Sequence, residues 1–214
     1  MNDKPTNSLG VLAALRRIAP TERLSTREAL HLAERQAEAF RDLTSTTGAR
    51  VSLDALRKLP HMRILRSRSL LWSGLSYWSG KDWVVCLDAT EPTRRQRLTA
   101  FHEYKHIIDH GRAHIIYGAD AAAADRAELV ADYFAGCVLI PRRPLRQAWR
   151  SGMRDVNALA RMFEASTRAV EVRLVQLGLV ADFNPSRPVR MICVDIEDLI
   201  EPSCLRRSRQ EAAA

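Results

Sequence analysis

Two histidines four residues apart, with a glutamate between them, are the residues of this chain best suited to chemistry. The stretch reads His102-Glu103-Tyr104-Lys105-His106. On a helix, residues four apart lie about 40° apart around the axis and one turn along it, so His102 and His106 point the same way. Both imidazoles can then bind one zinc ion, and Glu103 beside them can take a proton from water that the metal activates. The alternative interpretation is a helix with two incidental surface histidines.

The surrounding sequence favours the metal site over that alternative. Four of the six histidines of the chain lie between residues 102 and 114. The stretch is apolar enough to pack as a helix, and neither proline nor glycine interrupts it before Gly111. A polar pair with an acid between them is costly to bury in such a stretch unless it binds something.

A zinc site of this type needs a third protein ligand, and three candidates lie downstream. His110 is on the same helix, about 12 Å along the axis from His102, which is too far to complete the site. His114 follows a glycine turn, as in the longer His-Glu-x-x-His-x-x-Gly-x-x-His arrangement, but this glycine and this histidine are each displaced from that spacing. Glu128 lies on the next long helix, which can present it to the two histidines. We predict that the zinc ligands are His102, His106 and Glu128; the alternative for Glu128 is a hydrated acidic face.

Three more residues have expected roles around this site. Asp132 is one helical turn beyond Glu128 and could accept the second N–H of a ligand histidine, which would fix the tautomer of the ring. The His-Glu-x-x-His pattern is typical of zinc peptidases, so the expected chemistry is peptide hydrolysis, which also needs a donor to the negative oxygen of the transition state. His114 and Tyr117, in the loop between the two predicted helices, are candidates for that donor.

Helical and strand periodicities predict the elements that position these residues. Short amphipathic and capped helices precede a strand-rich stretch, in which residues 79–82 have the chemistry of a hairpin turn. The chain then becomes helical again. The fold class is α+β and mainly helical, with a small antiparallel sheet. The predicted helices are 9–18, 26–43, 52–59, 93–110, 121–140, 142–149, 156–163 and 167–177, and the predicted strands are 62–65, 75–78, 83–87 and, weakly, 189–194.

The two helices between residues 156 and 179 have the pattern of a helix–turn–helix. Arg168 and Arg173 lie on the second of them, as a DNA-reading helix would require. The recognition positions of that helix lack asparagine or glutamine for paired contacts with adenine. We therefore favour a pair of helices that closes the core or docks substrate over a pair that reads DNA.

Bulk composition restricts the class of protein. Apolar residues make up 46% of 214 residues, which is enough for a buried core. No apolar run could span a bilayer, and the polar N-terminus does not resemble a secretion signal. The four cysteines are far apart and form no Cys-x-x-Cys pair, which is typical of a reducing compartment. We expect a soluble, cytoplasmic protein without a membrane partner; the net charge of +8 permits an acidic partner without requiring one.

Two blocks of the sequence resemble the ImmA/IrrE family. The stretch from Arg97 to His106 is similar to the family pattern R-[FL]-T-x-x-H-E-x-x-H, and the stretch from Glu128 to Pro141 is similar to E-x-x-A-[ND]-x-F-A-x-x-L-L-M-P. The resemblance covers roughly residues 25–180. Lys105 stands where many members have glycine, and we expect it to lie along the helix surface with its charged head in water. Phe101 stands where a small residue is common.

The resemblance implies a zincin-like zinc endopeptidase that cuts a DNA-bound repressor, commonly one that governs a mobile element or a stress response. The expected protein substrate is a helix–turn–helix repressor. The alternative is a DNA-binding or toxin–antitoxin-type regulator that keeps zinc for structure. The expected organisation is an N-terminal segment (1–24), a metallopeptidase core (25–150), a helix–turn–helix-like pair packed on it (151–180) and a C-terminal extension with a partly disordered tail (181–214).

Overall fold

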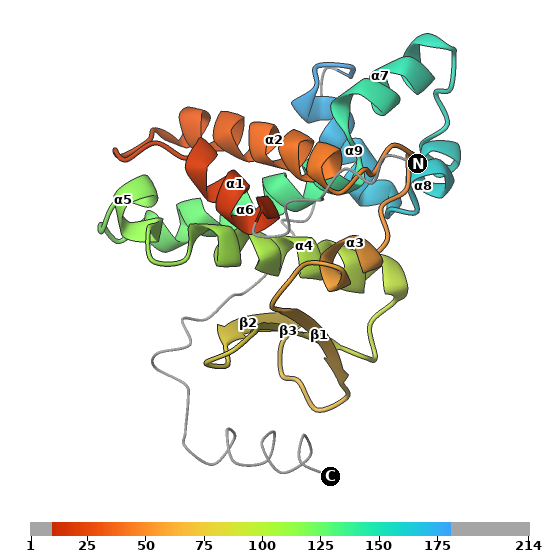
Figure 1. Ribbon diagram of the computed structural model, residues 1–214. Helices are drawn as coiled ribbons and strands as arrows, with labels where there is room; N and C mark the ends of the chain where they lie inside the picture. Colours follow the sequence, from red (N-terminus) through yellow and green to blue (C-terminus); the bar gives the residue numbers. More distant parts are fainter. Residues whose placement is uncertain (1–9, 181–214) are drawn as a thin grey trace, which may run out of the picture.

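A computed structural model describes residues 10–180 of the chain, in which a long central helix has other helices packed on one side and a small sheet on the other (Figure 1). The predicted strand at 189–194 and the predicted disordered tail lie outside the described residues. The helices are α1 (Gly10–Ile18), α2 (Thr26–Leu43), α3 (Asp54–Arg57), α4 (Thr93–Asp109), α5 (Ala113–Tyr117), α6 (Ala123–Leu139), α7 (Arg142–Arg150), α8 (Val156–Phe163) and α9 (Thr167–Gln176). The strands are β1 (Met62–Ser67), β2 (Gly74–Trp78) and β3 (Trp83–Asp88).

The central helix is α4, and it separates the sheet from the other long helices. Figure 1 shows the sheet below α4, and α2 and α6 above it. One face of α4 packs on β2 and β3, while the opposite face packs on α6. Because helix α4 is covered on both sides, most of its residues are buried, including polar ones. The prediction of a mainly helical α+β fold is confirmed.

The sheet is mixed, and the prediction of an antiparallel sheet is therefore wrong for one of its two strand pairs. The strand order is β1-β3-β2. The predicted hairpin is confirmed, since β2 and β3 pair antiparallel, but β1 and β3 pair parallel. Strand β3 inserts between two strands that are consecutive in the sequence, so β1 gains a parallel neighbour. Turn residues at the hairpin could not indicate that insertion.

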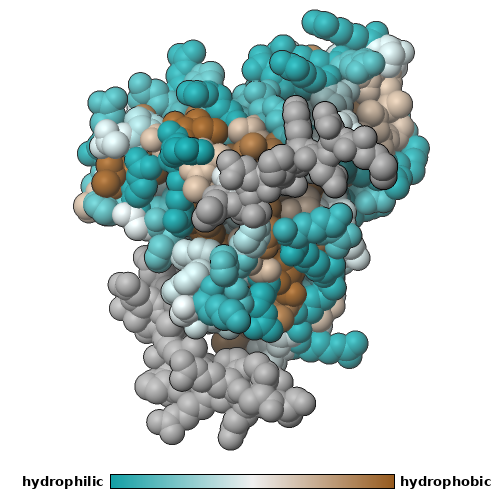
Figure 2. Space-filling model, in the orientation of Figure 1, coloured by the Kyte–Doolittle hydropathy of each residue, from teal (hydrophilic) through white to brown (hydrophobic). Residues whose placement is uncertain are grey.

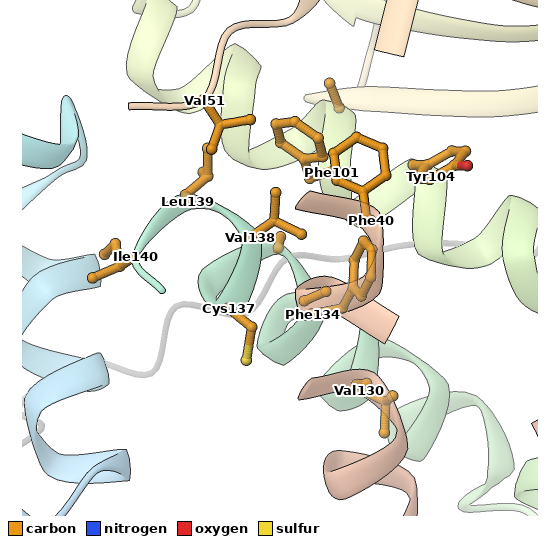
Figure 3. Close-up of a cluster of buried hydrophobic side chains, with 14 of the residues drawn as sticks. Phe40, Val51, Phe101, Tyr104, Val130, Phe134, Cys137, Val138, Leu139 and Ile140 are labelled. Carbon is orange, nitrogen blue, oxygen red and sulfur yellow. The ribbon is translucent and has the colours of Figure 1, made fainter. Parts of the chain in front are cut away.

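An aromatic cluster joins α2, α4 and α6. The ring of Phe40 lies edge-on to the rings of Phe101 and Tyr104, with centroid distances of 5.6 Å in both cases. Phe134 of α6 lies 6.5 Å from Tyr104. Figure 3 shows these side chains together with Val130 and Val138 on the same side of α6. All these side chains are buried, so the cluster fixes the spacing of the two helices that carry the predicted metal ligands.

Local sequence signals mark the start of α2 and both ends of α9. Ser25 accepts the backbone N–H of Glu28, and the Glu28 carboxylate accepts the backbone N–H of Ser25, which makes a capping box at the start of α2. Ser166 caps α9 in the same way through the N–H of Ala169. Gly178, with a φ of 64°, follows the end of α9 in the left-handed conformation that glycine tolerates best.

The second helix of the predicted helix–turn–helix is attached to the core through Arg173. Its guanidinium is 1% exposed, donates to the carbonyl of Ile140 and pairs with Glu34 of α2 at 2.7 Å. Arg168 pairs with Glu171 on α9 itself, at 3.9 Å. Arg173 is therefore buried in the protein and not presented to a ligand. The division of the chain at residues 24, 150 and 180 stays a proposal.

Candidate metal centre

Helix α4 presents His102 and His106 at the middle of its length, where it passes under α6. His102 is fully buried, whereas the side chain of His106 is 29% exposed. The two rings lie edge-on with centroids 4.8 Å apart, and their Nε2 atoms are separated by 3.0 Å. The i, i+4 spacing therefore brings both imidazoles to one point, and one side of that point reaches solvent.

Helix α6 brings the third predicted ligand to the same point. After α5 the chain turns back, and Glu128 places Oε2 3.2 Å from Nε2 of His102 and Oε1 3.2 Å from Nε2 of His106. The ligand atoms of these three residues all lie within 4.8 Å of one another, which makes them a candidate metal group among residues 10–180. Tight packing of α4 on α6 through the aromatic cluster makes this convergence possible.

This donor set fits a zinc ion. Two imidazole nitrogens and one carboxylate oxygen are the ligands of many catalytic zinc sites, and a fourth position is left for water or substrate. Ligand atoms about 2 Å from a tetrahedral zinc ion lie roughly 3.3 Å from one another. The separation of 3.0 Å between the two Nε2 atoms and the separations of 3.2 Å from each Nε2 to a carboxylate oxygen of Glu128 are close to that value. The residues present therefore suit a metal that His102, His106 and Glu128 would hold.

Asp132 lies behind the site, one helical turn beyond Glu128. Its Oδ1 atom is 2.8 Å from Nδ1 of His102. An Nδ1–H that donates to this carboxylate leaves the lone pair of Nε2 directed toward His106 and Glu128. The geometry thus agrees with the role expected of Asp132, which is to orient a metal-binding ring.

Glu103 points from α4 toward the sheet and meets a residue that sequence reasoning did not single out. The hydroxyl of Ser76, on β2, donates to Oε2 of Glu103 at 2.7 Å. Only 5% of the surface of Glu103 is exposed, so this hydrogen bond holds a carboxylate that has little contact with water. Ser76 belongs to the stretch Ser73-Gly74-Leu75-Ser76, to which the family resemblance extends, and that resemblance was the signal in the sequence.

Gly74 allows the close approach of β2 to α4. A Cβ atom at this position would lie 2.4 Å from Cγ2 of Thr99 and 3.0 Å from the carbonyl oxygen of Cys86. Neither contact is tolerable without a shift. Gly74 therefore sets the distance at which Ser76 reaches Glu103.

The other predicted residues lie away from the three converging ligand atoms. His110, which spacing excluded, ends α4 and stacks edge-on with Trp83 at 4.8 Å. His114 is on α5 and is exposed. Tyr117 is buried and donates its hydroxyl to Oδ2 of Asp109 at 2.5 Å. Burial and then the charge of Asp109 raise the pKa of Tyr117. The roles of His114 and Tyr117 as oxyanion donors stay predictions, and Tyr117 would have to leave Asp109 to act.

Lys105 does not lie in water, and the expectation that it would is wrong. Its side chain is fully buried, and Nζ lies 2.6 Å from both carboxylate oxygens of Asp109. Burial lowers the pKa of Lys105, while the adjacent carboxylate opposes that change. Asp109, four residues after Lys105, and the hydroxyl of Tyr117 complete a buried polar group under α5. This group links the last turn of the histidine-bearing helix to the segment that leads into α6.

Comparisons with known proteins agree with this geometry. A profile of the family Peptidase_M78, described as IrrE N-terminal-like domain, matches residues 62–175, which include both metal-bearing helices. Among solved structures, the chain is similar to a Mycobacterium tuberculosis transcriptional regulator, with a TM-score of 0.52 and 16% sequence identity. That similarity covers 86% of this chain and 54% of the other, so this chain spans about half the length of the regulator, and at this identity the likeness concerns the fold alone. No match was found among curated protein sequences.

Proposed function

Because the chain belongs to the IrrE N-terminal-like family of metallopeptidases, we propose that it is a zinc-dependent endopeptidase that cuts a DNA-binding transcriptional repressor. The observation that carries the proposal is the convergence of His102, His106 and Glu128 next to Glu103. A metal site held only for structure is normally closed by four protein ligands. Here three ligand atoms converge at a point that solvent can reach past His106.

His102, His106 and Glu128 would hold the metal. Zinc bound by these residues supplies Lewis-acid chemistry, which makes water a stronger acid and polarises a peptide carbonyl. Asp132 keeps His102 in the tautomer whose Nε2 can bind a cation. The protein's contribution is thus a preorganised set of neutral imidazoles and one carboxylate.

Glu103 would act as the general base and then as the general acid. Ser76 fixes Oε2, so the carboxylate has one orientation relative to α4 and keeps lone pairs that can accept a proton from water. The same group, once protonated, can return the proton to the departing amine. A buried carboxylate held by one neutral donor suits both steps, because it keeps lone pairs that can accept the proton and later return it.

The free edge of the sheet would guide the substrate to Glu103. Strand β2 is an edge strand, and no described segment pairs with its outer side. The carbonyl of Ser73 accepts from the N–H of Asp88 in β3, and the N–H of Ser79 donates to Asp82 just before β3. By alternation, the N–H and C=O groups of Gly74, Ser76 and Trp78 face outward. An extended peptide can pair with such an edge, and its main chain would then run past Glu103. This supports an unfolded or extended segment of a protein as the substrate.

The experiment that tests the proposed function first reads the genes on either side and then incubates the zinc-loaded chain with any helix–turn–helix regulator encoded there. We expect the chain to cut that regulator at a defined bond. Glu103→Gln should lower the cleavage rate by about 10²- to 10⁴-fold and leave zinc content unchanged, because the amide has the size of the carboxylate and replaces no metal ligand, but cannot take a proton. Cleavage is followed by gel electrophoresis and mass spectrometry, and zinc by atomic emission.

Glu38→Gln is the matched control, because Glu38 is an exposed acid on α2, away from the site. It should cut as fast as the unmodified protein. A Glu103→Gln protein that keeps its zinc and full proteolytic activity would exclude the proposed mechanism. Unchanged regulator in the presence of zinc-loaded protein would exclude that substrate.

A further inference from the structure

We propose that α7 is a binding surface for the phosphate backbone of double-stranded DNA, formed by Arg143, Arg146 and Arg150. These three residues, called the arginine stripe below, are three and four positions apart on one helix. At that spacing neighbouring side chains share one face. Leu145 and Ala148 occupy the opposite face of α7 and are buried. The stripe is therefore presented outward.

Several buried and half-buried arginines of this protein are committed to internal contacts, in contrast to the stripe. Arg16 donates to the carbonyls of Ile107 and Ile108 at the end of α4, and Arg41 donates to the carbonyl of Val138 at the end of α6. Such contacts satisfy helix carbonyls that have no partner within the helix. Their positive charge serves the fold and not a ligand.

The side chains of the arginine stripe make few such contacts within the described residues. Among residues 10–180, Arg143 and Arg150 form no ion pair, and Arg146 makes one long contact of 3.4 Å with the carbonyl of Leu177. No aspartate or glutamate occurs between residues 133 and 154, a stretch with five arginines. Like charges at these spacings destabilise a helix by about 0.2–0.5 kcal/mol per pair, so the arrangement is unfavourable unless an anion neutralises it.

The chemistry of the surface favours nucleic acid over an acidic protein. The fully exposed positions of α7 are Arg143, Gln147 and Arg150, and none of them is apolar. Protein interfaces usually contain apolar or aromatic anchors at their centre. Guanidinium groups bind phosphate oxygens through paired hydrogen bonds, without such anchors. A polyphosphate backbone therefore fits the stripe better.

Dimensions and the neighbouring tryptophan favour the duplex over a single strand. The stripe spans seven residues, or about 10 Å of helix, and one DNA strand carries a phosphate every 3.4 Å of axis, so the stripe faces about three phosphates. Single-strand binding relies on exposed aromatic rings on which bases stack. The ring of Trp149 is instead covered by Arg154, whose guanidinium carbon lies 4.1 Å from its centroid.

The surface is separate from the peptidase site. Figure 1 shows α7 at the top right, on the opposite side of the helical layer from the sheet and far from α5. Figure 2 shows mainly hydrophilic residues over that top right part of the surface. Binding there would leave the free edge of β2 open. A consequence that rests on the proposed function is that the enzyme would be concentrated near proteins bound to the same DNA.

The test compares the full zinc-loaded chain with Arg143→Gln/Arg146→Gln/Arg150→Gln in fluorescence anisotropy titrations of a labelled random-sequence duplex. We expect the triple variant to lose at least about tenfold in affinity at 50 mM salt, and the slope of log K against log salt to become less steep by about 3. The matched control is Arg27→Gln/Arg35→Gln/Arg63→Gln, which removes the same charge from exposed positions on α2 and β1. It should change the slope by less than 1.

Three results would overturn the proposal. The first is that the unmodified chain does not bind the duplex at 50 mM salt. The second is that the two triple variants lose the same affinity for the duplex. The third is that the unmodified chain binds polyglutamate or single-stranded DNA at least as tightly as the duplex. Circular dichroism and thermal unfolding check that each variant is folded. Loss of DNA binding with unchanged cleavage of a free regulator would separate this surface from the peptidase site.

Discussion

At the scale of single residues, the candidate site depends on partners that hold each reactive group in one orientation. His102 is held by Asp132, and Glu103 is held by Ser76. The first of these partners follows from the sequence, because an acid one turn beyond a predicted ligand is a common arrangement. The second does not, because Ser76 is 27 residues from Glu103 in the chain and meets it only through packing of β2 on α4.

The role of Asp132 leads to a prediction about metal affinity. Asp132→Asn removes the charged acceptor for Nδ1–H of His102, so the ring loses both basicity and a fixed tautomer. We expect zinc affinity to fall by about 10- to 100-fold while the protein remains folded. Competition with a chromogenic chelator measures this change.

Asp125→Asn is the control for that measurement. Asp125 is an exposed acid in the first turn of the same helix, α6, and does not contact His102. Its replacement should leave zinc affinity within about twofold of the unmodified protein. Equal zinc affinities in the Asp132→Asn and unmodified proteins would show that Asp132 does not support the site.

At the scale of elements, most helices were predictable and one strand pairing was not. The ends of α2, α8 and α9 follow from serine and aspartate caps that act locally. The short helix α5 was expected as a loop, since five residues give no readable period. The parallel pairing of β1 with β3 depends on which strands meet in space, and local sequence does not record that.

The contact of β2 with α4 gives a prediction at this scale. Gly74→Ala places a methyl group 2.4 Å from Cγ2 of Thr99, so β2 must move away from α4. We expect a loss of about 1–3 kcal/mol in the free energy of unfolding, and slower cleavage because Ser76 moves from Glu103. Chemical denaturation and the regulator-cleavage assay measure the two effects.

A second substitution tests the cause. Thr99→Ser removes Cγ2 and keeps the hydroxyl, so Gly74→Ala combined with Thr99→Ser should recover part of both losses. The contact with the carbonyl of Cys86 at 3.0 Å remains, so recovery should be incomplete. Strictly additive effects of the two substitutions would contradict a steric origin.

At the scale of the whole molecule, arginine is the residue that joins distant segments. Arg97 links α4 to the carbonyls of Val51 and Glu164, and Arg112 links α5 to the end of α1. Many of the positive charges that give the net charge of +8 are therefore structural, and the sequence alone does not separate them from those available to a ligand. None of the helices in residues 10–180 is long and apolar enough to cross a membrane.

The ion pair of Glu34 with Arg173, which joins α2 to α9, gives a prediction about pH. Burial raises the pKa of Glu34, but the hydrogen bond and charge of Arg173 outweigh it, so the pKa lies below its usual value of 4.5. A carboxylate whose pKa is lowered by folding stabilises the protein above its unfolded pKa, and that stability is lost as pH falls through the folded pKa. Glu34→Gln should therefore lower the free energy of unfolding by about 2–3 kcal/mol at pH 7, and this difference should shrink below about pH 4.5.

Chemical denaturation of both proteins between pH 7 and pH 3 measures this dependence. Glu38→Gln, at an exposed position on the same helix, should follow the unmodified protein over the whole range. A cost for Glu34→Gln that is the same at pH 7 and at pH 3 would mean that the ionised pair does not stabilise the attachment of α9.

The sequence by itself determined the chemistry of this protein's candidate site. Histidines at i and i+4 on a helix must share a face, and the apolar residues that follow Glu128 require its helix to pack against another, so the ligands could be named from spacing and residue type. Tertiary structure decided how those groups are held and reached. It placed Ser76 on Glu103, buried Lys105 against Asp109, turned Arg173 inward and left the edge of β2 and the face of α7 open. These outcomes depend on contacts between segments far apart in the chain, whose register is set by packing and not by any local periodicity.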